Sequence, residues 1–110
     1  MLEGLFGNAT AEKVLLYLEQ YGEGYALAIA DTFDKVTLSM VQRQLERFER
    51  AGLLVSVKKG RTRLFQWNPR YSFVGEVRAI LRKALLALPE RDQRRFFRER
   101  RRPRRTGKPP

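Results

Sequence analysis

Polar and basic side chains able to bond to nucleic acid recur at helical spacing between residues 38 and 50. Arginine can donate two hydrogen bonds to guanine, and glutamine can pair in the same way with adenine. Ser39, Gln42 and Arg43 stand early in this segment and are candidates for contacts with base edges. Arg47 and Arg50 stand further along and suit phosphate oxygens better. These residues predict a helix whose outward face reads duplex DNA.

A second basic cluster occupies the segment Lys58-Lys59-Gly60-Arg61-Thr62-Arg63. On a short polar turn, its four cations could grip the DNA backbone or enter the minor groove. The candidate contacts are Lys58, Lys59, Arg61 and Arg63. Two simpler interpretations remain open, because lysine and arginine also protect exposed sheet edges and any solvated helix has a charged face. The two clusters side by side favour nucleic-acid binding.

The composition of the 110 residues excludes most catalytic chemistry. The chain has no cysteine and no histidine, so it has no thiolate nucleophile, imidazole base or ordinary transition-metal site. Ser39, Ser56 and Ser72 have no basic partner suited to nucleophilic catalysis. The paired acids, Asp31 with Asp34 and Glu46 with Glu49, are more simply solvated residues than oxygen ligands. We therefore expect neither an enzyme nor a bound metal or cofactor.

The net charge of +11 is unevenly distributed along the chain. Residues 90–110 contain ten basic and three acidic residues, and they end in a stretch with nothing apolar to bury. We expect residues 1–89 to form one domain and residues 90–110 to form a basic tail that is disordered at its end. The tail adds nonspecific affinity for polyanions, or acts as an arm that tracks phosphates or enters the minor groove. The sequence shows neither a signal peptide nor an apolar run long enough to cross a membrane, so we expect a cytoplasmic protein.

Apolar periodicity predicts the elements that position these residues. Helices are expected over about 10–21, 25–33, 38–51 and 71 or 72 to 88, and the segments 53–57 and 64–67 predict a hairpin with a Gly-bearing turn. The Gly22-Glu23-Gly24 segment reads as the end of the first helix. The expected core includes Leu27 in the second helix, a stripe in the third and a broad side of the fourth: Leu38, Val41, Leu45 and Phe48, then Val74, Val77, Ile80, Leu81, Leu85 and Leu88.

The order of three helices, a hairpin and a final helix is accompanied by a family resemblance. The segment from Leu38 to Leu54, with its apolar spacing followed by Ala51-Gly52-Leu53, resembles the recognition helix and first wing strand of ArsR-type winged helix-turn-helix regulators. Residues 5–10 and 63–69 are similar to the opening and the second wing strand of that family. The resemblance covers roughly residues 5–88 and implies a mainly α fold with a small β-hairpin, in the order α-α-α-β-β-α.

The resemblance also implies a function. It suggests a homodimeric transcriptional regulator that binds double-stranded DNA with its third helix in the major groove. The metal-sensing cysteines and histidines of many family members are absent here. Two other functions stay open: a nonspecific or architectural nucleic-acid binder, and a winged helix that serves as a protein-interaction module.

Overall fold

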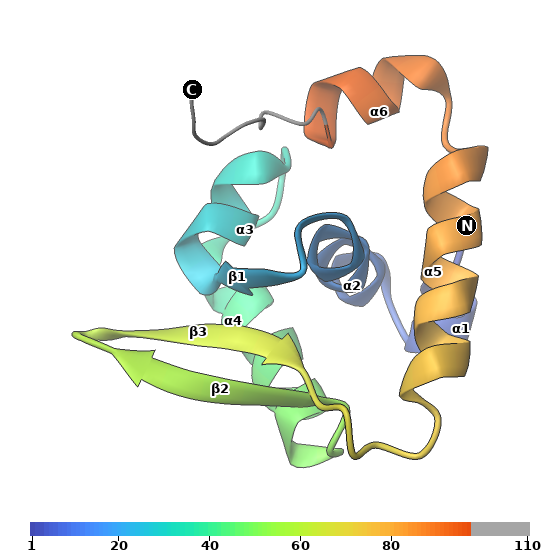
Figure 1. The fold of residues 1–110 in the computed structure, drawn as a ribbon. Helices are drawn as coiled ribbons and strands as arrows, with labels where there is room; N and C mark the ends of the chain where they lie inside the picture. Colours follow the sequence, from blue (N-terminus) through green and yellow to red (C-terminus); the bar gives the residue numbers. More distant parts are fainter. Residues whose placement is uncertain (98–110) are drawn as a thin grey trace, which may run out of the picture.

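The computed structural model describes residues 1–97 and is mainly helical, with a small antiparallel sheet (Figure 1). A central helix is surrounded by the other helices, and a long hairpin projects to one side. In chain order the elements are α1 (Glu3–Phe6), α2 (Ala9–Tyr21), β1 (Glu23–Tyr25), α3 (Ala26–Thr32), α4 (Leu38–Arg50), β2 (Leu54–Lys59), β3 (Thr62–Trp67), α5 (Val74–Ala87) and α6 (Glu90–Phe96).

Side-chain caps fix where α2 and α4 begin. The Asn8 side chain accepts a hydrogen bond from the Ala11 backbone N–H at 2.8 Å, and the Thr37 hydroxyl accepts one from the Met40 N–H at 3.2 Å. Asn8 and Thr37 are therefore the N-caps of α2 and α4. Gly22 ends α2 with a φ of 86°, in agreement with the predicted stop.

The sheet has the strand order β1-β3-β2, and β1 was not predicted. A strand of three residues is too short to show a periodicity, and only its pairing with β3 defines it. Gly24 lies opposite Phe65 in this strand. A Cβ at Gly24 would lie 2.6 Å from the Tyr17 ring, so the close approach of β1 to α2 requires glycine. Within the Gly22-Glu23-Gly24 segment, Gly22 ends α2, and the other two residues belong to β1.

The hairpin between β2 and β3 has a tighter turn than predicted. Lys59 pairs with Thr62, which leaves only Gly60 and Arg61 in the turn, and Gly60 has a φ of 62°. The predicted six-residue turn is thus wrong at its ends. Lys58 and Arg63 lie in the strands, directly opposite each other and on one face of the sheet. The hairpin therefore presents its cations from a rigid ladder.

The core lies between α2, α4, the sheet and α5. Leu15, Leu18, Leu45 and Leu81 are fully buried, and the Trp67 indole donates to the Leu18 carbonyl at 3.2 Å. The core predictions for Leu27 and Leu38 are wrong, because their exposed fractions are 57% and 40%. Each starts a helix beside the hairpin, where no element packs over it.

Helix α5 begins at Val74, after a turn at residues 71–73, and so starts later than predicted. Its predicted apolar side is only partly covered, since Leu81 is buried while four others are half-buried: Val74, Val77, Leu85 and Leu88. Ala84, which was not predicted, is buried as well. The core prediction for Ile80 is wrong, because it is exposed, as are Phe73 and Leu86. The exposed side of α5 therefore combines Ile80 and Leu86 with charged residues: Glu76, Arg82 and Lys83.

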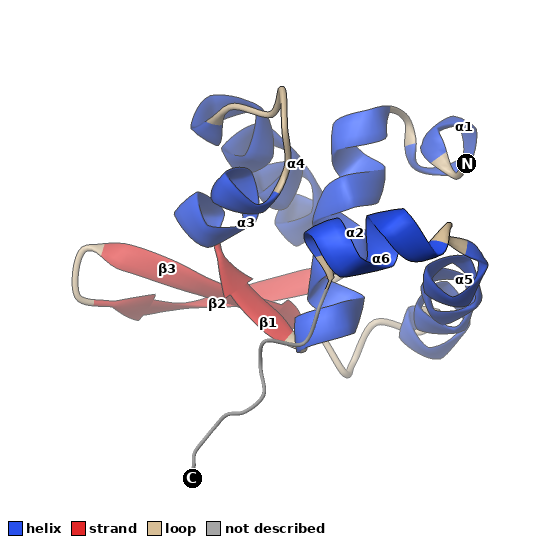
Figure 2. Ribbon diagram, turned by 90° about the horizontal axis from the view of Figure 1, so that it is seen from above, coloured by secondary structure: helices blue, strands red, loops and turns tan. Residues whose placement is uncertain are grey.

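Helix α6 lies beyond the predicted domain boundary at residue 89 and packs on the rest of the molecule (Figure 2). The Phe33 ring lies 5.3 Å from that of Phe96 and 5.6 Å from that of Phe97, between centroids. The Gln20 amide donates to the Phe97 carbonyl at 3.2 Å, and Arg95 forms an ion pair with Asp34. The first part of the predicted tail is thus a packed helix; the disorder predicted further on falls outside the described residues.

Candidate nucleic-acid interface

Helix α4 separates an apolar side from a polar one. Val41, Leu45 and Phe48 are buried, whereas Ser39 and Arg43 are exposed on the opposite side. Arg50 and Gln42 are exposed as well. In residues 1–97 no carboxylate or hydrogen-bond acceptor engages the guanidinium groups of Arg43 and Arg50. The sequence placed these residues on the outward face correctly, and they remain available to an external anion.

Arg47 lies on the shoulder of α4 and faces α1 instead. Its guanidinium donates to the Phe6 carbonyl and, at 2.7 Å, to the Gln44 side-chain oxygen. It also lies 4.7 Å from the Phe48 ring centroid and packs against Gly7. These contacts give Arg47 a structural role in joining α1 to α4. Its contact with phosphate stays a prediction, and a phosphate would have to compete with the Phe6 carbonyl and Gln44 for the guanidinium.

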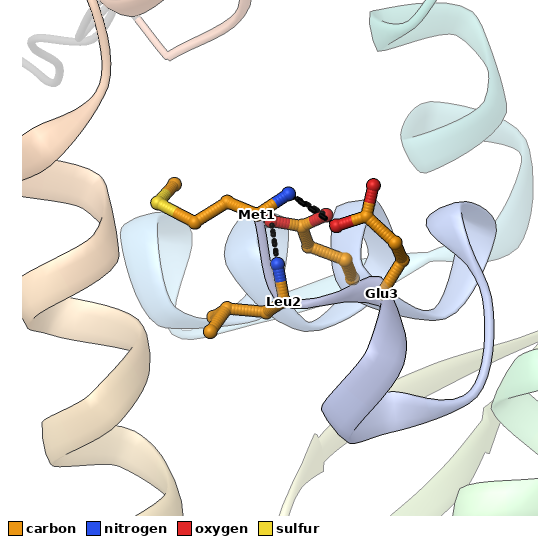
Figure 3. A network of polar contacts seen from close by, with 4 residues as sticks. Met1, Leu2 and Glu3 are labelled. Carbon is orange, nitrogen blue, oxygen red and sulfur yellow. Dashed lines mark hydrogen bonds and ion pairs between the residues drawn. The ribbon is translucent and has the colours of Figure 1, made fainter.

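A network of charges holds α1 against α2 and so supports the Arg47 contact (Figure 3). The Glu12 carboxylate accepts a hydrogen bond from the Leu2 N–H at 3.0 Å and lies 3.5 Å from the Met1 ammonium. The Met1 ammonium also pairs with Glu3. This hydrogen bond raises the pKa of the ammonium and lowers the pKa of the Glu3 carboxyl.

The β2–β3 hairpin carries four of the predicted contact residues, and they differ in whether another side chain holds them. Lys58, Lys59 and Arg61 are exposed, and within the described chain none of them forms an ion pair. Arg63 donates to the Ser56 hydroxyl at 3.1 Å, and that hydroxyl donates to the Glu49 carboxylate at 2.6 Å. This chain of hydrogen bonds ties the hairpin to α4. Arg63 is also exposed, but it is held by Ser56, whereas the other three cations have no ion-pair partner among the described residues.

A cleft of about 410 Å³ separates α4 from the hairpin. Leu38, Gln42 and Glu46 line one wall at successive turns of α4. The other walls come from β3 and from the junction of β1 and α3: Arg61, Thr62, Arg63 and Phe65, then Tyr25, Ala26 and Leu27. Sequence reasoning missed the apolar part of this cleft, because the spacing of Leu27 and Leu38 is that of core residues. Only the placement of the hairpin shows that they face a cleft.

Comparison with known proteins adds no identification. No protein-family model matches the sequence, and no curated protein matches it. In the part of the chain that the structure describes, no three acidic residues gather as a metal site would require. Over the same residues, 1–97, no helix is long and apolar enough to cross a bilayer.

Proposed function

We propose that this protein is a winged helix-turn-helix regulator that binds specific sequences of duplex DNA. The order of α2, α3, α4, the β2–β3 hairpin and α5 supports this fold, with α3 and α4 as the helix-turn-helix and the hairpin as the wing. The observation that carries the proposal is the set of cations on two adjacent elements that no described carboxylate neutralises: Arg43, Arg50, Lys58, Lys59 and Arg61.

The parts of the interface take different roles in this proposal. Helix α4 enters the major groove, where Ser39, Gln42 and Arg43 meet base edges near its N-terminal end. Arg50 and the wing cations contact phosphates and set the register without reading sequence. The Arg63–Ser56–Glu49 bonds hold the wing at a fixed distance from α4. A preformed pair of contact elements loses little conformational entropy on binding.

The proposed regulator is a homodimer, with α5 in the interface. Phe73, Ile80 and Leu86 expose 61%, 39% and 79% of their surface, which is apolar area that a second copy would cover. Two-fold symmetry would place two α4 helices about 34 Å apart, in successive major grooves of a roughly palindromic site. Sedimentation equilibrium tests this point, since Leu86→Glu should convert a dimer into monomers.

The deciding experiment selects bound fragments from random duplex DNA with the full chain at near-physiological salt. An enriched, roughly symmetric motif supports the proposal, and Arg43→Ala should lose part of that motif. Arg91→Ala is the matched control, because it removes one exposed positive charge from α6, which belongs neither to the proposed DNA surface nor to the proposed dimer interface. Binding without an enriched motif indicates a nonspecific nucleic-acid binder. Negligible binding indicates a protein-interaction module.

A further inference from the structure

The cleft between α4 and the wing has an apolar wall at a place where a phosphate-binding surface would be polar. Leu27, Leu38 and Tyr25 are exposed by 57%, 40% and 37%, and all three line this one cleft. Single exposed apolar residues are common and need no explanation. Three of them together, beside a helix whose outward face is basic, indicate an apolar group in the ligand.

The chemistry of the cleft matches a base edge better than a phosphate. Glu46 lines the same wall as Gln42, and its carboxylate would repel a phosphate held there. The same carboxylate can accept a hydrogen bond from the amino group of adenine or cytosine. Arg61 and Arg63 on the opposite wall supply the positive charge that draws a polyanion to the cleft.

Leu38 and Gln42 lie four residues apart, so their side chains are neighbours on one side of α4. In the major groove an A·T pair presents N7 and N6 of adenine, which a glutamine amide can engage with two hydrogen bonds. The same pair presents the C5 methyl of thymine, which prefers an apolar contact. An amide and an apolar side chain one helical turn apart therefore match both features.

We propose that this cleft reads an A·T step in each half-site, with Gln42 on adenine and Leu38, backed by Leu27, against the methyl of a thymine in the same or the adjacent pair. The inference rests on the proposed function, and it names the base chemistry that α4 selects. It gives a role to two residues whose exposure the core pattern leaves unexplained.

Replacing thymine by deoxyuracil tests the inference, because the exchange removes only the C5 methyl. With the full chain and the selected site, each thymine of a half-site is replaced in turn and Kd is measured. At one position Kd should rise about fourfold, the equivalent of about 0.8 kcal/mol for one methyl group. The Leu38→Ala variant should bind the thymine and uracil sites equally. Leu5→Ala, at an exposed leucine on α1, is the matched control and should retain the fourfold difference.

Three outcomes would overturn the inference, and they differ in what else they affect. If uracil is tolerated at every position of a well-defined motif, the methyl contact is absent while the proposed function stands. If the fourfold difference persists in Leu38→Ala, another residue contacts the methyl. If no motif is selected at all, the proposed function fails and this inference fails with it.

Discussion

The cations of α5 and α6 differ from those of α4 and the hairpin in what surrounds them. Four of the six on α5 and α6 form ion pairs: Arg78 and Arg82 with Glu19, Arg94 with Glu90, and Arg95 with Asp34. Helix α4 and the β2–β3 hairpin together carry seven cations, and none of the seven forms an ion pair with another residue of the described chain, 1–97. Both regions are basic in sequence, so local charge count alone does not locate the binding surface. The pairing of the cations is the feature that distinguishes the surface that we propose for DNA binding.

The largest expected effect comes from removing an unpaired cation on α4. Arg43→Ala should weaken binding to the selected site by roughly 10- to 100-fold, because a bidentate contact to a base contributes about 1–3 kcal/mol. Its thermal unfolding midpoint should not change, since Arg43 has no partner among the described residues. Fluorescence anisotropy with labelled duplex measures the loss. An equal loss on unrelated sequences would show that Arg43 contacts phosphate rather than a base.

The next largest effect concerns the stability of the fold and comes from the ion pairs between α2 and α5. The Glu19 side chain is 5% exposed and accepts hydrogen bonds from Arg78 at 2.8 Å and Arg82 at 3.1 Å. Glu19→Gln should lower the free energy of unfolding by about 1–2 kcal/mol, because it removes the buried charge that both arginines share. Urea unfolding measures this change.

Glu90→Gln provides the control for Glu19→Gln, since the Glu90–Arg94 pair is exposed on both sides and should contribute at most about 0.5 kcal/mol. DNA affinity of both folded variants should remain close to that of the parent protein. A large loss of affinity in Glu19→Gln would place the α2–α5 side in the DNA interface and end the distinction between the two regions.

The pattern of elements was predictable, and the surface chemistry was less so. Residues with a strong local signal, such as the stripe of Val41, Leu45 and Phe48 in α4, lie where periodicity placed them. Strand β1 and the exposure of Leu27 and Leu38 depend on how the hairpin packs against α3 and α4, which no local pattern contains. Arg47 shows the same limit, because its partner Phe6 lies 41 residues away in sequence.

Arg47 tests the boundary between the two regions, because it lies on α4 yet already has partners. Arg47→Ala should destabilise the fold by about 1 kcal/mol through loss of its bonds to the Phe6 carbonyl and Gln44. Affinity for the selected site should change less than twofold. Thermal unfolding and anisotropy on the same sample separate these effects. A drop in affinity with an unchanged melting temperature would instead support the phosphate contact that the sequence predicted.

The smallest effect concerns the wing, where each cation contributes through counterion release rather than through a specific bond. Lys59 is exposed near the tip of the hairpin, and Lys59→Ala should weaken binding about threefold on specific and unrelated duplexes alike. The slope of log K against log salt concentration should fall by about 0.9, the value for one phosphate contact. Arg91→Ala, on α6, should leave that slope unchanged. Equal slopes for the two variants would mean that unpaired charge on the wing behaves like any other surface charge. The cations of the hairpin would then only protect the exposed edge of β2.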